Sequence, residues 1–141
     1  MASTTSANAP AVRKRVFHPG SLGMLLGGVL ALVGSLLPWV MTPVGSLPGL
    51  AGPGLWTLSA AFIAIAGALL PYRKIAIGHC LAAGLAVAVI AGWQLGRLVY
   101  LSAITDAWGQ MLPGIGLVMV SGGAVILLRT GYRLVTARQG T

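Results

Sequence analysis

The chain has 141 residues, of which 57% are hydrophobic and only 7% are charged, whereas about a quarter of an ordinary soluble domain is charged. Its mean hydropathy is +0.92. So short a chain cannot bury this much apolar surface in water, which excludes a soluble globular protein. Disorder requires low hydrophobicity, so a disordered protein is excluded as well. The net charge is +8, but the cations stand at the ends of apolar runs, which argues against nucleic-acid binding.

Four apolar segments are long enough to cross a bilayer, whose core requires about 20 apolar residues per helix. We expect spans at about residues 21–40, 53–70, 75–98 and 111–128. None of these segments alternates apolar and polar residues as a barrel strand would. In lipid, backbone N–H and C=O groups find hydrogen-bond partners only in helices or closed barrels. The sequence therefore predicts an all-α integral membrane protein, with four transmembrane helices in a compact bundle over residues 13–128.

Basic residues mark one side of the predicted membrane domain. Eight of the nine cations precede the first span, follow the last span or separate the middle two, so both termini are expected to be cytoplasmic. Residues 1–12 are small and uncharged and predict a disordered tail, and residues 129–141 predict a basic tail. The cations expected to contact anionic lipids are Arg13, Lys14, Arg15, Arg73, Lys74, Arg129 and Arg133.

Aromatic residues mark the opposite side. Trp39, Trp56, Trp93 and Trp108 fall at outer helix ends or in outer loops, where amphipathic rings favour the membrane interface, so all four are expected to be anchors. The first span ends in LVGSLLPWV, which resembles small membrane proteins of high-GC bacteria. That resemblance covers one span and implies no activity. We expect the protein to lie in a bacterial plasma membrane.

A shift of 60 residues superposes several unlike features of the chain. It places Arg13-Lys14 on Arg73-Lys74, Pro53-Gly54 on Pro113-Gly114, and Tyr72-Arg73 on Tyr132-Arg133. One interpretation is a tandem duplication of a two-helix hairpin, related by an axis along the membrane normal. The other is coincidence, helped by the recurrence of basic residues at every inner helix end.

The third span carries small residues at every fourth position. They are Ala76, Cys80, Gly84, Ala88, Gly92 and Gly96. Because residues four apart share a helix face, we expect a flat surface for close helix contact, with Gly92 and Gly96 forming one GxxxG motif. This surface serves either packing within the monomer or docking onto another subunit or copy.

A few polar residues remain as candidates for chemistry. Gln94, Arg97 and Asp106 predict an outer polar cluster that binds a partner loop or an anionic lipid head group, with Arg97 and Asp106 as an ion pair. The alternative is that Arg97 alone extends to lipid phosphates. His18 and His79 open the first and third spans and would suit a metal or b-type haem if those helices touch. A lone His is rarely a ligand, so no metal or other cofactor is expected.

The missing chemistry narrows the function. The chain has no Glu, one Asp in a predicted outer loop and one Cys, which disfavours a proton-coupled carboxylate in the membrane and an intramolecular disulfide relay. Phosphate-loop and nucleophile motifs are also missing, so an enzyme is not expected.

The leading hypothesis is a non-catalytic accessory or assembly subunit of a larger membrane complex, with other membrane-protein subunits or a second copy as partner. The alternatives are a holin-like homo-oligomeric pore former and an uncoupled carrier of an apolar or lipidic substrate.

Overall fold

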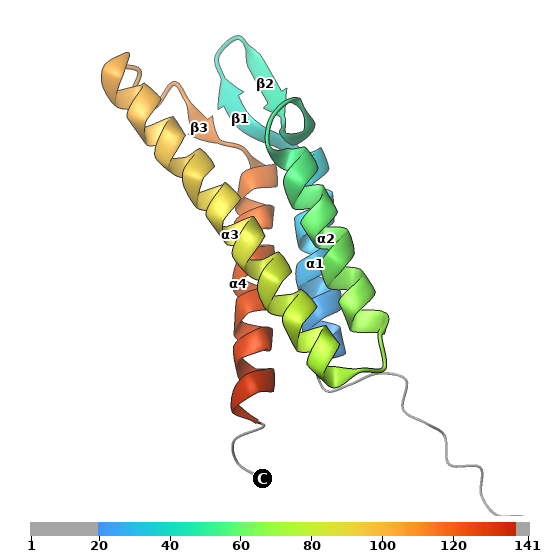
Figure 1. Cartoon of the computed structure of the whole chain (residues 1–141). Coiled ribbons are helices and arrows are strands. Elements are labelled where there is room, and N and C mark those ends of the chain that lie inside the picture. Colours follow the sequence, from blue (N-terminus) through green and yellow to red (C-terminus); the bar gives the residue numbers. More distant parts are fainter. Residues whose placement is uncertain (1–19, 138–141) are drawn as a thin grey trace, which may run out of the picture.

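The computed structural model describes residues 20–137, which form four helices and a small sheet (Figure 1). The helices are α1 (Ser21–Leu36), α2 (Gly54–Leu69), α3 (Arg73–Ile104) and α4 (Ile115–Thr136). The strands are β1 (Pro38–Thr42), β2 (Gly45–Pro48) and β3 (Leu112–Pro113), and η1 (Gly49–Ala51) is a short 3-10 helix. The predicted N-terminal tail and Arg13, Lys14, Arg15 and His18 lie outside the described residues.

The prediction of a mainly helical chain with four helices is confirmed. Two of them, α3 and α4, are long and apolar enough to cross a membrane. The other two, α1 and α2, have 16 residues each and are about 24 Å long, shorter than a hydrocarbon core of about 30 Å. Helix length therefore supports two of the four predicted spans, and the other two stay a prediction.

The first predicted span ends earlier as a helix than expected. The helix stops at Leu36, and Leu37 is extended, with φ −80° and ψ 166°, because the following Pro38 disfavours a helical conformation before it. The chain continues as β1, which pairs antiparallel with β2 through a turn at residues 43–44, and Gly45 opens β2 with φ +148°. On its other side β1 pairs with β3, giving the strand order β2-β1-β3.

The third and fourth helices run beyond their predicted ends. The third begins at Arg73 and ends only at Ile104, before a turn in which Asp106 adopts a left-handed conformation with φ 50°. The fourth begins after Pro113 and Gly114 and continues to Thr136, so much of the predicted basic tail at residues 129–141 is helical.

The four helices form a ring in chain order, with α1 packed on α2 and α4, and α3 packed on α2 and α4. The sheet covers one end of the bundle, here called the sheet end, and the α2–α3 turn lies at the other, here called the basic end (Figure 1). The hairpin of α1 and α2 has equal arms, whereas α3 has 32 residues and α4 has 22. The two helix pairs that a tandem duplication would relate are therefore unequal in length, and the duplication remains an interpretation.

The contact between α1 and α4 is the closest in the bundle. A Cβ atom added to Gly116 would lie 2.6 Å from the carbonyl oxygen of Gly34, and one added to Gly123 would lie 2.7 Å from that of Gly27. In each helix the two glycines are seven residues apart. The two backbones thus touch directly, as helices do where dispersion and not the hydrophobic effect drives their association.

Buried hydroxyl groups are satisfied inside the bundle. Ser35 Oγ donates to the carbonyl oxygen of Ala31 at 2.6 Å and shares a hydrogen bond with Thr57 Oγ1, also at 2.6 Å. This pair joins α1 to α2 close to the sheet end. Pairing of this kind removes the cost of placing a hydroxyl in an apolar interior.

Candidate functional site

The small-residue ladder of α3 does not lie on one face of the helix. Ala76, Cys80 and Gly84 are buried, whereas Gly92 and Gly96 are exposed. With 3.6 residues per turn, each step of four residues rotates the face by about 40°, or about 200° over the five steps of the ladder. The expectation of one flat surface is therefore wrong, and the ladder winds from the interior to the outside.

The part of α3 near the basic end is packed closely against α4. Cys80 Sγ donates to the carbonyl oxygen of Leu127 at 3.1 Å, and a Cβ added to Gly84 would lie 3.1 Å from Leu127 Cβ. On α4, a Cβ added to Gly131 would lie 2.5 Å from Leu81 Cδ2. These small residues serve packing within the monomer, which is one of the two roles expected for the ladder.

The outward side of α3 forms a continuous exposed stripe, here called the open face. Its residues follow alternating steps of four and three, namely Gly78, Ala82, Leu85, Val89, Gly92, Gly96, Val99 and Ala103. A Cβ added to Gly78, Gly92 or Gly96 would meet nothing within 4 Å. Alternating steps of four and three keep residues on one side of a helix, so this stripe offers a second helix a shallow surface.

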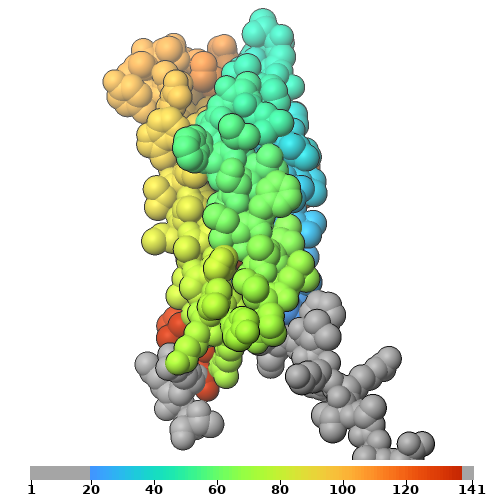
Figure 2. Space-filling model, turned by 45° about the vertical axis from the view of Figure 1, so that its right-hand side comes forward, coloured from blue at the N-terminus to red at the C-terminus, as the bar shows by residue number. Residues whose placement is uncertain are grey.

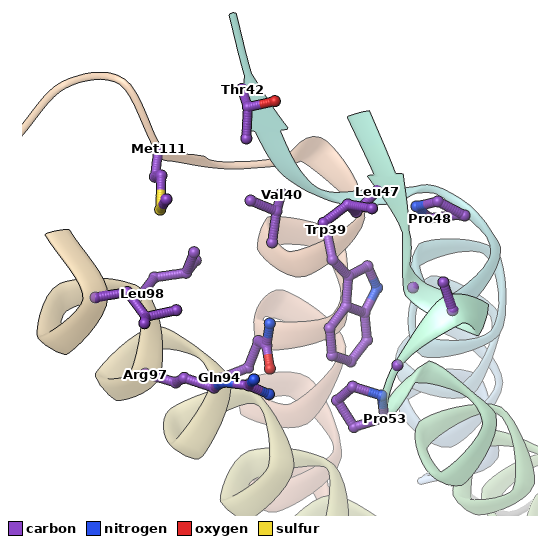
Figure 3. A pocket seen from close by; sticks show the side chains of 14 residues that line it. Trp39, Val40, Thr42, Leu47, Pro48, Pro53, Gln94, Arg97, Leu98 and Met111 are labelled. Atoms are coloured by element: carbon purple, nitrogen blue, oxygen red, sulfur yellow. The ribbon is translucent and has the colours of Figure 1, made fainter. Parts of the chain in front are cut away.

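A cavity of about 320 Å³ lies at the sheet end, between α3, the β1–β2 hairpin and the start of α2. We call it the sheet-end cavity. Figure 3 shows Gln94 and Arg97 side by side on α3, both extending toward Trp39 and Pro53. The remaining walls of the sheet-end cavity are largely apolar and include Val40, Leu47, Leu98, Leu101 and Met111.

Two polar side chains of the cavity, Gln94 and Arg97, have a group with neither a hydrogen bond nor an ion pair to the described residues. Gln94 Oε1 is buried and accepts no hydrogen bond from any described residue. The guanidinium group of Arg97 lies 5.6 Å from the ring centroid of Trp93, a cation–π contact. Among residues 20–137 it has no ion pair, so the expected Arg97–Asp106 bridge is wrong, and the predicted cluster reduces to Gln94 and Arg97.

Trp39 belongs to the interior, which corrects its assignment as an interfacial anchor. Its side chain is 2% exposed, against 56%, 61% and 72% for Trp93, Trp108 and Trp56. Its Nε1 donates to the carbonyl oxygen of Gly34 at 2.9 Å. In a continuous helix the backbone N–H of residue 38 would fill this role, but residue 38 is proline and has none. The indole therefore completes the end of α1.

A second depression, the α2–α3 groove, adjoins the sheet-end cavity. It measures about 440 Å³, and its walls are Gly52, Pro53, Trp56, Val89, Ile90 and Trp93. Gly52 and Pro53 also line the sheet-end cavity, so the two spaces share a wall. Figure 2 shows α2 and α3 side by side on this side of the molecule, with α2 in green and α3 from lime to yellow.

Part of the predicted anionic-lipid surface converges at the basic end. Arg73 Nη2 donates to the carbonyl oxygen of Leu134 at 3.2 Å, which ties the start of α3 to the end of α4. Arg73 and Arg133 line a cavity of about 600 Å³ together with Thr130. The side chains of Lys74 and Arg129 are exposed.

The expected histidine pair has one described member. His79 Nδ1 forms a hydrogen bond with the carbonyl oxygen of Ile75 at 2.9 Å. Within residues 20–137 there is no group of three or more potential metal ligands. A pairing of His79 with His18 lies outside the described residues.

The chain matches no protein-family model, no curated protein and no solved structure.

Proposed function

We propose that the protein is a non-catalytic membrane protein that acts as an accessory or assembly subunit of a larger membrane complex. All four helices cross the bilayer, the basic end faces the cytoplasm, and a helix of another subunit packs on the open face of α3. The observation that carries this proposal is the uncovered Gly92–Gly96 pair.

The outward faces of the bundle favour the membrane. Large apolar side chains are exposed on every helix, among them Leu22, Phe62, Val89 and Val125. Apolar surface that continues around all sides is unfavourable in water and is expected in lipid. The described cations other than Arg97 gather at the basic end, as the positive-inside rule requires of a cytoplasmic side.

The glycines of α3 favour a partner helix. Glycine in a helix costs about 1 kcal/mol relative to alanine, so it is expected where close contact offsets that cost. Gly27, Gly34 and Gly123 meet this expectation because neighbouring atoms leave no room for a side chain. Gly92 and Gly96 have no such neighbour within the monomer. A second helix packed on them would supply the contact.

The interior favours a subunit over a pore formed within one bundle. The buried side chains of the described core are mostly Ala, Leu and Val, and the hydroxyls of Ser35 and Thr57 bond to each other and to backbone carbonyl oxygens of their own helices. This core offers ions no polar path along the bundle, and conduction requires a lining of polar or charged groups.

Site-specific photocrosslinking tests the proposal. A photoreactive residue replaces Val89 on the open face or, as a matched control, Val125 on the exposed side of α4. After irradiation in native membranes, mass spectrometry identifies the adducts. We expect one membrane protein to be captured from position 89 and not from position 125.

The same experiment is repeated with Gly92→Leu and Gly96→Leu combined, and with Gly122→Leu, since Gly122 is equally open. The double variant should reduce the adduct about tenfold, and Gly122→Leu should leave it unchanged. Equal capture from both positions, or an adduct that survives the double variant, would contradict the proposal. Adducts with the chain itself would favour the homo-oligomeric pore former.

A further inference from the structure

We propose that the sheet-end cavity and the α2–α3 groove together bind one anionic amphiphile. Its acidic head group lies against Arg97 and Gln94, and one of its acyl chains lies between Trp56 and Trp93. This binding site adjoins the open face, because Val89 borders both, but the proposal does not rest on the partner helix proposed above.

The charge of Arg97 favours an anion from outside the described residues. The whole sequence contains one acidic residue, Asp106, and Arg97 forms no ion pair within the described residues. Arg97 is exposed at the edge of the cavity, so an anion can approach the guanidinium group from outside. Its planar fork of N–H donors matches a phosphate or carboxylate group.

The carbonyl group of Gln94 requires a hydrogen-bond donor at the same place. Its Oε1 is buried beside Arg97 and has no partner among the described residues (Figure 3). An anion alone does not satisfy an acceptor, because an acceptor needs an O–H or N–H group. The head group that fits therefore combines an anionic oxygen with a hydroxyl group close to it, as a glycerol phosphodiester does.

The groove supplies the place for a chain. It is lined by Val89, Ile90 and two tryptophans, and it shares Gly52 and Pro53 with the cavity that holds the polar groups. A ligand with its head group in the cavity can thus extend past Pro53 into apolar surroundings. A small soluble anion would fill only the cavity, so the adjoining groove favours a lipid.

Tryptophan quenching tests the site, because all four tryptophans, Trp39, Trp56, Trp93 and Trp108, belong to the half of the molecule that includes the sheet end. The purified protein in a neutral maltoside detergent is titrated with phosphatidylglycerol or phosphatidylcholine that carries brominated acyl chains. We expect phosphatidylglycerol to reach half-maximal quenching at about one tenth of the concentration that phosphatidylcholine needs.

Three variants test which residues cause the preference for phosphatidylglycerol over phosphatidylcholine. Circular dichroism confirms that each variant is folded. Arg97→Gln should bring the two lipids to the same half-saturation, and Gln94→Leu should reduce the preference. Arg129→Gln removes an exposed cation at the basic end and should leave the preference unchanged. Equal quenching by both lipids in the wild type, or a preference that survives Arg97→Gln, would overturn the proposal.

Glycerol phosphate distinguishes a lipid from a soluble anion. If a lipid occupies both spaces, unbrominated phosphatidylglycerol displaces the brominated lipid and glycerol phosphate at the same concentration does not. Equal displacement by phosphatidylglycerol and glycerol phosphate at the same concentration would show that the groove is not used. It would overturn the proposal that the ligand is an amphiphile. Since this assay uses the isolated protein, its outcome is separate from the crosslinking result at position 89.

Discussion

Two surfaces of this molecule are rich in glycine, and only one of them is closed. Where α1 meets α4, Gly34 and Gly116 bring two backbones into contact. On the open face of α3, Gly92 and Gly96 face nothing within 4 Å. The comparison teaches that glycine content does not by itself locate a helix contact.

The spacing of the glycines explains the difference. A step of seven residues falls about 20° short of two full turns, so seven-residue spacing on α1 and α4 keeps the glycines along one seam. The step of four on α3 overshoots one turn by about 40° and carries the ladder away from its neighbour. The steps of three and four that mark the open face instead follow one side of the helix.

The largest expected effect is at the closed surface. Gly123→Leu should lower the free energy of unfolding by about 3 kcal/mol, because its side chain would force α1 and α4 apart. The adjacent Gly122 has no neighbour within 4 Å, so Gly122→Leu should not destabilise the protein and should raise the free energy of unfolding by up to about 1 kcal/mol, because leucine favours a helix more than glycine does. Denaturation by sodium dodecyl sulfate in mixed micelles measures both. Equal losses would show that the seam is not as close as described.

A second pair of variants compares the buried and the exposed parts of α3. Gly84→Leu should cost about 2 kcal/mol, since a Cβ there already lies 3.1 Å from Leu127 Cβ. Gly92→Leu, two ladder steps away, should not destabilise the isolated protein and should raise its free energy of unfolding by up to about 1 kcal/mol. The same micelle assay reports both. A large loss for Gly92→Leu would place that residue inside the bundle.

A smaller effect is expected where α1 ends. Trp39→Phe keeps most of the buried ring but leaves the carbonyl oxygen of Gly34 without its donor, a loss of about 1–2 kcal/mol. Trp93→Phe on the exposed side of α3 should cost much less. Thermal melting by circular dichroism compares the two. If the two variants melt alike, the indole hydrogen bond contributes nothing to the helix end.

The smallest effect concerns the hydroxyl pair between α1 and α2. A double-mutant cycle with Ser35→Ala and Thr57→Val should give a coupling energy of about 0.6 kcal/mol, as for other hydrogen bonds between membrane helices. The two oxygens are 2.6 Å apart. Additive losses in the micelle assay would mean that each hydroxyl is satisfied by its own helix.

Local signals in the sequence were enough for the helices and for several of their ends. Both α2 and α4 begin at a Pro-Gly pair, because proline and glycine interrupt regular structure. The first residue of α2 is Gly54 of the Pro53-Gly54 pair, and α4 begins directly after Pro113-Gly114. The break at Leu37 was not predicted, because the expected span ran through Pro38 to residue 40. The pairing of Val40 with Pro113 was not predicted either, because it joins residues far apart in the chain and depends on the bundle that brings them together.

The candidate site was predictable only within one helix. Gln94 and Arg97 are three residues apart, and that spacing places two side chains on the same side of α3. Asp106 was expected beside Arg97 on the assumption that the helix ends near residue 98. The helix runs to Ile104, so Asp106 lies nine residues farther on, or about 13 Å along the axis. Trp39 was missed because its role depends on what packs around it.

If all four helices cross the bilayer as proposed, their unequal lengths have a consequence for the surrounding lipid. Side by side in the ring stand α1 and α2, each about 24 Å long, and α3, about 48 Å long. A bilayer adjusts its thickness to the apolar length that it meets. Lipid tails next to α1 and α2 would therefore be compressed, while α3 would lean or raise the surface beside it. The protein would then sit in a wedge of uneven bilayer and would favour regions where the membrane is already thin or curved.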